Sequence, residues 1–166
     1  MENIEVENAI ISKQFEDSNN LKEFLNIVAE RNIKIMLVEA GDRLNIEKNL
    51  YFNILWPDNS EFISENGLNN NSIVCKLVYK NFSTLFTGDI EEIAEKQIVS
   101  KYKNSKKLNS TILKVAHHGS KTSSIQEFLK MVNPKIVLIG VGKNNNFGHP
   151  NKQVIERLQN LRCYSL

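Results

Sequence analysis

Three short segments carry side chains that can bind a metal ion, and each lies beside a run of apolar residues. These side chains are Asp89 after residues 83–88, His117 and His118 after residues 111–116, and His149 within residues 147–150. Carboxylate and imidazole groups are the usual ligands of Zn²⁺, Mn²⁺ and iron in proteins. Because strand ends hold side chains rigidly, the pattern predicts a metal centre at the edge of a sheet.

Each segment also has an ordinary structural interpretation. Asp89 directly precedes a predicted helix, where aspartate is a favoured N-cap. The histidine pair can lie on the surface, and the loop around His149 can simply precede the next helix. Three such segments in one chain are less expected by chance than any one of them, which favours a shared site.

The histidine pair is the most specific of the three segments. Adjacent histidines that leave a strand would point to opposite faces, so one can enter a site while the other orients it or faces water. Gly119 permits a tight turn after them, and Ser120 can donate a hydrogen bond to an oxyanion. The sequence leaves open which of His117 and His118 is the ligand.

Hydrophobic periodicity predicts helices and strands in alternation around these segments. Helices are expected over residues 21–31, 90–102, 124–132 and 151–161, the first capped by Asn19 or Asn20. Strands are expected over residues 33–38, 51–56, 72–79, 83–87, 111–116 and 135–139, with 162–166 beginning another and 58–71 forming a loop. The fold class is therefore α/β (α+β), with a mixed sheet and flanking helices.

Length and composition fit one domain with its own core, at 166 residues and 41% hydrophobic residues. No apolar run approaches the roughly 18 residues of a membrane span. The acidic N-terminus is not a signal peptide. Cys75 and Cys163 form no disulfide framework and are expected to be thiols in a reducing compartment.

The charge is divided unevenly along the chain. Residues 1–95 hold 8 basic and 17 acidic side chains, whereas residues 96–166 hold 13 basic and 2 acidic ones. Seven lysines and no acid lie between Lys96 and Gln126. This bias can attract phosphates or nucleic acid, or it can form a solvated lysine-rich face beside the acidic half.

The order and spacing of the motifs resemble those of the metallo-β-lactamase-fold domain of the competence protein ComEC and its stand-alone relatives. The matching segments are residues 85–91, 113–123, 140–142 and 145–150, with residues 41–57 and the asparagine-rich run to Ser72 also similar. The His-His-Gly-Ser and Gly-His-Pro segments are fairly specific to that group. The resemblance covers roughly residues 20–161.

The resemblance implies an αββα sandwich with one or two divalent ions, Zn²⁺ or Mn²⁺, between two sheets. It implies that Asp89 contacts or bridges the metals, that His117 is the late metal-binding histidine with His118 beside it, and that His149 faces the substrate. Catalytic roles would fall to Asp89, His118 and His149, and substrate binding to Ser120, Lys121, Asn145 and His149. In ComEC the domain belongs to a membrane channel for DNA uptake and is regarded as a nuclease.

One departure from the family pattern is decisive. Such domains open with a His-x-His-x-Asp-His motif, but this chain has only three histidines and none precedes Asp89. We therefore expect residues 1–166 to form a single, truncated domain, the C-terminal half of the sandwich, with an apolar sheet face uncovered.

The predicted reaction is metal-dependent hydrolysis of phosphodiesters or DNA, in which metal-bound water supplies the nucleophile. The chain alone is expected to be inactive or weakly active, because most metal ligands are missing. The alternatives are a non-catalytic DNA-binding or assembly module that pairs with a separate N-terminal half or a membrane channel domain, and the product of a broken gene. The expected location is cytoplasmic for a stand-alone protein and membrane-associated for part of a ComEC-type protein.

Overall fold

The structure, a computed structural model, describes residues 4–14, 18–58, 62–161 and 164–165. Its strands are β1 (Asn8–Ser12), β2 (Lys34–Val38), β3 (Arg43–Glu47), β4 (Leu50–Trp56), β5 (Val74–Tyr79), β6 (Phe82–Phe86), β7 (Ile112–Lys114), β8 (Ile136–Leu138) and β9 (Tyr164–Ser165). Its helices are α1 (Asn19–Glu30), α2 (Gly67–Asn70), α3 (Glu92–Tyr102), α4 (Gln126–Val132) and α5 (Lys152–Gln159), with a 3₁₀ turn at Ala116–Gly119. The predicted α/β class is confirmed.

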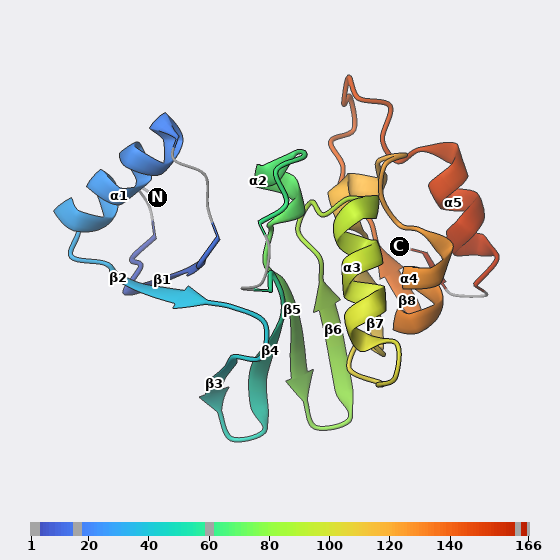
Figure 1. The fold of residues 1–166 in the computed structure, drawn as a ribbon, viewed down its shortest axis with the longest axis horizontal. Helices are drawn as coiled ribbons and strands as arrows, with labels where there is room; N and C mark the ends of the chain where they lie inside the picture. The colour runs from blue at the N-terminus through green and yellow to red at the C-terminus, as the bar shows by residue number, and fades with distance from the viewer. Residues whose placement is uncertain (1–3, 15–17, 59–61, 162–163, 166) are drawn as a thin grey trace.

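A mixed sheet forms the centre of the molecule (Figure 1). Its strand order is β3-β4-β5-β6-β7-β8-β9, antiparallel from β3 to β6 and parallel from β6 to β9. Short turns join β3 to β4 and β5 to β6, and a longer segment that contains α2 joins β4 to β5, whereas α3, α4 and α5 connect the parallel strands. Since parallel strands point the same way, the carboxyl ends of β6, β7 and β8 meet at one edge of the sheet.

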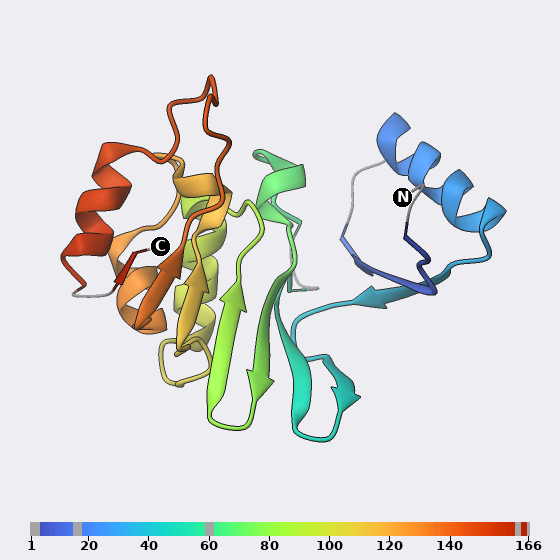
Figure 2. The ribbon, with the colours of Figure 1, turned by 180° about the vertical axis from the view of Figure 1, so that it is seen from behind.

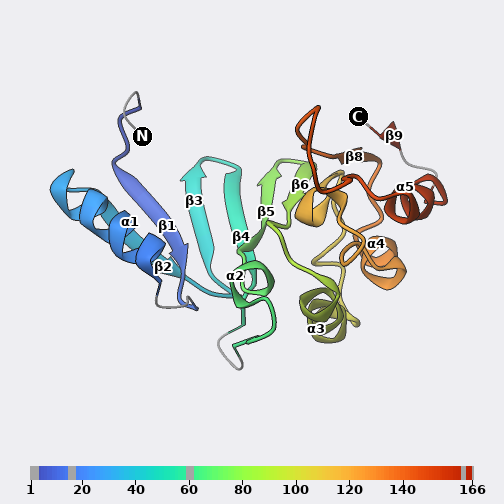
Figure 3. The same cartoon turned by 90° about the horizontal axis from the view of Figure 1, so that it is seen from above.

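The helices α3, α4 and α5 all cover one face of this sheet (Figure 3). Leu85, Leu113 and Val137 point from three neighbouring strands into the core beneath them, and each is at most 1% exposed. Phe128 of α4 and Val154 of α5 complete the same cluster. Burial of these apolar side chains is the main force that holds the helices on the sheet.

On the opposite face of the sheet the described residues place no helix, as the view from behind shows (Figure 2). Apolar side chains lie on it, among them Phe52 and Phe86, whose ring centroids are 6.5 Å apart. At its margins Tyr79 and Phe82 are each 42% exposed. An uncovered apolar face was the sequence-based expectation, and it is present here. The truncation from which it was argued stays a prediction.

A small unit formed by β1, α1 and β2 lies beside the main sheet (Figure 1). β1 and β2 pair in parallel, and Val28 of α1, Ile33 and Val38 are buried in this unit. The N-cap of α1 is Ser18, whose Oγ accepts a hydrogen bond from the Leu21 amide at 3.1 Å. The prediction of Asn19 or Asn20 was therefore wrong by one or two residues.

The sequence missed three elements, and most of the predicted ends differ from those in the structure by one or two residues. The missed elements are β1, β3 and the short helix α2, which lies inside the predicted loop of residues 58–71. The predicted strand over residues 111–116 ends at Lys114, and the helix expected from Ile90 begins at Glu92. Neither β1 nor β3 contains a buried residue, so they lack the apolar alternation that reveals a half-buried strand.

Two further predictions concern the cysteines and membrane-spanning segments. Cys75 is a free thiol, and burial raises its pKa to about 11, whereas Cys163 and Arg162 lie outside the described residues. Within the described ranges, no helix has both the length and the apolar character needed to cross a bilayer.

Candidate functional site

Asp89 lies just beyond β6, on a turn that requires glycine. Gly88 has φ +54°, and a Cβ built on it would lie 2.6 Å from the Cβ of Ser72. The Asp89 amide also faces the Ser72 hydroxyl at 3.4 Å. Asp89 is not the N-cap of α3, a position held by Glu91. The ordinary interpretation of Asp89 as a helix cap was therefore wrong, and its carboxylate is left at the edge of the sheet.

The histidine pair forms a left-handed turn rather than the end of a strand. His117 has φ 47° and His118 has φ 54°, values that residues other than glycine adopt rarely. The His117 amide donates to the Gly88 carbonyl at 3.2 Å, and the Ser120 amide donates back to His117 at 2.8 Å. The expectation that the two rings leave an extended strand on opposite faces was wrong, because these contacts curl the backbone around Gly88.

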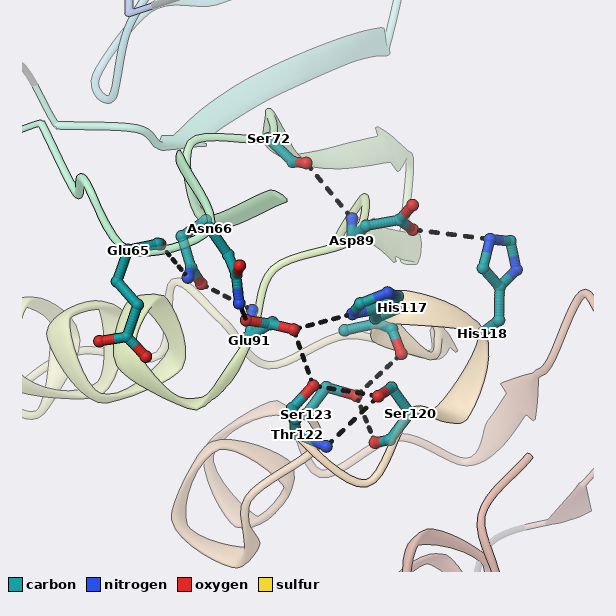
Figure 4. Close-up of polar contacts among 12 residues, drawn as sticks. Glu65, Asn66, Ser72, Asp89, Glu91, His117, His118, Ser120, Thr122 and Ser123 are labelled. Carbon is teal, nitrogen blue, oxygen red and sulfur yellow. Dashed lines mark hydrogen bonds and ion pairs between the residues drawn. The ribbon is translucent and has the colours of Figure 1, made fainter. Parts of the chain in front are cut away.

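Asp89 and His118 face each other across this edge (Figure 4). The Oδ1 atom of Asp89 lies 3.8 Å from Nε2 of His118 and 4.0 Å from Nζ of Lys114. Nδ1 of His118 lies 2.5 Å from the carbonyl oxygen of Gly140. A carbonyl can only accept, so Nδ1 carries the proton, and in the neutral ring Nε2 turns a lone pair toward the carboxylate.

His117 faces a different carboxylate, that of Glu91. Its Nδ1 lies 3.3 Å from Oε1 of Glu91, an ion-pair distance, yet within the described part of the chain this buried nitrogen makes no hydrogen bond. Glu91 accepts hydrogen bonds from Asn66 Nδ2 at 2.7 Å and from Thr122 Oγ1 at 2.8 Å. The structure thus brings Asp89 to His118 and places His117 in a second polar cluster (Figure 4).

Glu91 and Thr122 are members of this cluster that the sequence did not predict. Glu91 reads as an acidic residue in the first turn of a helix, and Thr122 as part of a polar loop. Glu91 is only 8% exposed, and the Asn70 side chain accepts from its backbone amide at 2.9 Å. The one sequence signal that could have suggested Glu91 is its position two residues after the Gly88-Asp89 pair.

His149 approaches the site from the loop after β8. Its ring lies edge-on to His117, with centroids 5.9 Å apart, and it stacks on Phe147 at 5.9 Å. Asn145 holds this loop, because its amide donates to the His149 carbonyl at 2.8 Å and accepts from the His149 amide at 3.0 Å. His118, His149 and Phe147 line a hollow of about 260 Å³.

Ser120 and Lys121 lie on the other side of the histidine turn. Ser120 is 6% exposed, and its hydroxyl lies 3.0 Å from the Thr122 hydroxyl. Lys121 is exposed and lines a separate hollow of about 390 Å³ with the acids Glu65, Glu91 and Glu92. Neither residue lines the hollow between His118 and His149, and their substrate-binding roles, like those of Asn145 and His149, stay predictions.

A buried carboxylate fixes the scaffold behind the site. Glu95 of α3 accepts hydrogen bonds from the amides of Ser124 and Ile125, at 2.6 and 2.7 Å, where α4 begins. Arg157 of α5 donates to the carbonyls of Ser123 and Ser124. Desolvation raises the pKa of Glu95 to about 7, against the opposing effect of the two amides and Arg157. Three helices are thereby joined at the segment that follows the histidine turn.

The donor set can be compared with what a divalent metal requires. Asp89 and His118 offer an oxygen and a nitrogen that face each other, and a carbonyl fixes the histidine ring, as is usual for metal-bound histidines. Catalytic zinc, however, takes three protein ligands. Across the described ranges no group of three or more His, Cys, Asp or Glu side chains is placed to hold an ion. The residues present therefore do not fit a complete catalytic centre.

Comparison with known proteins identifies relatives of this chain. No family model matches the chain. It is 34% identical over 154 residues to ComE operon protein 3 of Bacillus subtilis, covering 93% of this chain and 19% of that protein. It is 34% identical over 108 residues to competence protein ComA of Neisseria gonorrhoeae, covering 65% and 15%. A metal-dependent hydrolase from Parabacteroides distasonis shares the fold, with a TM-score of 0.51 and 12% identity over 95% of this chain and 74% of that one.

The chain is related over most of its length to one segment of ComE operon protein 3 and over 108 residues to one segment of ComA, as the resemblance in its sequence predicted. It spans less than a fifth of the length of the competence proteins that it matches.

Proposed function

We propose that this chain contributes the Asp89–His118 edge of a ComEC-like, metal-dependent phosphodiester hydrolase whose substrate is DNA. The observation that carries the proposal is the approach of Oδ1 of Asp89 to Nε2 of His118, 3.8 Å apart. A carboxylate oxygen and an imidazole nitrogen are usual donors to a divalent cation, and here the other ring nitrogen of His118 is held by the Gly140 carbonyl. DNA is favoured because two relatives are named for competence and residues 96–166 are strongly basic.

His118, rather than His117, is the proposed ligand beside Asp89. The Gly140 carbonyl keeps the proton on Nδ1 and leaves Nε2 for a cation. His117 directs its Nδ1 to Glu91, which two other side chains already hold in place. This choice differs from the implication of the family resemblance, which gave the ligand position to His117.

Metal binding tests this assignment directly. Titration with Mn²⁺ and Zn²⁺ should detect weak binding that falls by about 10-fold or more in Asp89→Asn and in His118→Ala, because each removes one of two ligands. His117→Ala is the matched control and should bind as wild type. Loss in His117→Ala with retention in His118→Ala would contradict the assignment, and equal binding by all variants would contradict a metal site here.

The chain alone should hydrolyse DNA weakly or not at all. Two donors leave most of the coordination sphere to other groups, so the metal would be held loosely and its bound water poorly placed. The measurement is cleavage of linear DNA and of a small phosphodiester with added Mn²⁺ or Zn²⁺. Rapid metal-dependent turnover that disappears in Asp89→Ala would contradict the predicted inactivity and would show that this chain is sufficient.

A second candidate is a non-catalytic DNA-binding or assembly module. The incomplete donor set and the uncovered apolar sheet face favour it. DNA binding that depends on salt but not on divalent metal, without cleavage, would support this function over hydrolysis. Cleavage gained on mixing with a separate domain that carries the His-x-His-x-Asp-His motif would instead support the hydrolase.

A further inference from the structure

A second concave feature lies at the opposite edge of the sheet from Asp89 and His118. It is a cleft of about 630 Å³ on the helix-covered face, between β4 and β5 and the segment that connects α3 to β7. Ser83 at the start of β6 lines it, whereas Asp89 follows the other end of that strand. Ser83 and Asp89 are six residues apart, roughly 20 Å at about 3.3 Å per residue.

The cleft is lined by basic and aromatic residues. Its lysines come from three elements: Lys76 from β5, Lys80 from the turn between β5 and β6, and Lys106 and Lys107 from the connection after α3. Tyr51 and Tyr102 are part of its wall. The acid in the lining is Asp42, which accepts a hydrogen bond from the Glu39 amide at 2.9 Å.

The connection that carries two of these lysines is held firmly in place. Leu108 is fully buried in the core. The ammonium of Lys76 lies 3.0 Å from the Lys107 carbonyl and 2.5 Å from the Asn109 carbonyl, so it donates to both. Lys76 therefore supports the segment between α3 and β7. The backbone that carries Lys106 and Lys107 is held in place by these hydrogen bonds and by Leu108.

Balancing the helix dipole does not account for these charges. Cations near the C-terminus of a helix are favourable, and Lys101 in the last turn of α3 already provides one, although it pairs with Asp58. Lys80 comes from a strand turn and has no part in that balance. In the described part of the chain neither Lys80 nor Lys106 contacts a carboxylate, and Lys80 and Lys107 lie over tyrosine rings.

We propose that this cleft binds the sugar-phosphate backbone of single-stranded nucleic acid. Lysines from separate elements converge on one concavity and are not neutralised there, which is how proteins track a phosphodiester strand without reading its sequence. Lysine supplies point charges rather than the planar fork that recognises one phosphate. The cleft is pocket-sized, so it suits a single strand rather than a duplex. The inference rests on the proposed function only for the choice of DNA as the polymer.

The test measures binding without turnover. A fluorescent single-stranded DNA is titrated with the protein in EDTA at several salt concentrations. Replacing Lys80, Lys106 and Lys107 together by alanine should weaken binding by at least about 10-fold and reduce the salt slope by about 2, near 0.7 for each lost phosphate contact. The matched control, with alanine at Lys130, Lys135 and Lys152, removes the same charge from other surfaces and should keep both values.

Several outcomes would overturn the proposal. They are wild-type affinity and slope in the cleft variant, an equal loss in the control, tighter binding of duplex than of single-stranded DNA, and competition by polyglutamate as effective as that by DNA. Thermal unfolding shows whether each variant is folded. The titration contains EDTA and measures no turnover, so failure of the hydrolase proposal leaves this result interpretable.

Discussion

Charged side chains are arranged differently at the Asp89 edge of the sheet and at the lysine-lined cleft near its opposite edge. At the Asp89 edge, carboxylates and imidazoles face one another, and Glu91 alone accepts hydrogen bonds from two side chains. At the other edge, Lys80 and Lys106 converge on a cleft with no carboxylate contact in the described residues. The first edge depends on a fixed backbone, and the second on net charge. Substitutions at the first should therefore affect stability, and those at the second should affect only binding.

The largest expected effect on stability comes from the turn that presents Asp89. Gly88→Ala places a Cβ 2.6 Å from that of Ser72, at a φ of +54° that alanine disfavours. The free energy of unfolding should fall by about 2–4 kcal/mol, measured by chemical denaturation. Gly142→Ala is the control, because its Cβ would meet no atom within 4 Å. Equal stability of the two variants would show that the Asp89 edge is not rigidly held.

The next effect is a pH dependence that arises behind the same edge. Burial raises the pKa of Glu95 from 4.5 to about 7, so the folded protein binds this proton more tightly than the unfolded chain does. The stabilising contribution of Glu95 is then complete below about pH 4.5 and is lost as the pH rises to about 7. It should amount to about 3 kcal/mol across that range.

Glu95→Gln should flatten this part of the profile of unfolding free energy against pH. Glu127→Gln, an exposed change on α4, should leave the profile as it is in the wild type. Arg157 and Glu92 also act on Glu95 and remain in both variants. A wild-type profile that rises between pH 4.5 and 7 because of Glu95 would show that the hydrogen bonds from Ser124 and Ile125 outweigh burial.

The smallest effect is expected at the cleft. Lys106→Ala should change the free energy of unfolding by less than about 0.5 kcal/mol, because the side chain is exposed and pairs with no described acid. Chemical denaturation at low salt gives the most sensitive measurement. A loss above about 1 kcal/mol would mean that the lysine supports the connection after α3, and the two edges would then differ less than proposed.

The sequence predicted the parts of the fold in which apolar residues alternate or recur at helical spacing. The hairpin of β5 and β6 and the helices α1, α3 and α5 were found in this way, because each buries one face. The histidine turn was not, since the left-handed conformation of His117 and His118 is imposed by contacts with Gly88 and the loop near Gly140. The local sequence alone favours an extended backbone that continues the predicted strand through His117 and His118.

The candidate site was predictable by residue type but not by pairing. Asp89, His118 and His149 could be named from their positions after strands. That His118 rather than His117 meets Asp89 depends on a backbone turn that no spacing rule describes. The lysine cleft was visible only as a charge bias after Lys96. Lys80 lies well before that run and joins it only because β5 and β6 carry it to the same edge.

The packing of Gly119 against Pro150 has a thermodynamic consequence. A Cβ on Gly119 would lie 2.8 Å from that of Pro150, and the Gly119 carbonyl accepts from the Asn151 amide at 2.8 Å. The backbones that carry His118 and His149 are thereby fastened together before anything binds. A molecule that enters the hollow between them would meet walls already in position, so its association would lose little protein entropy and its selectivity would come from shape.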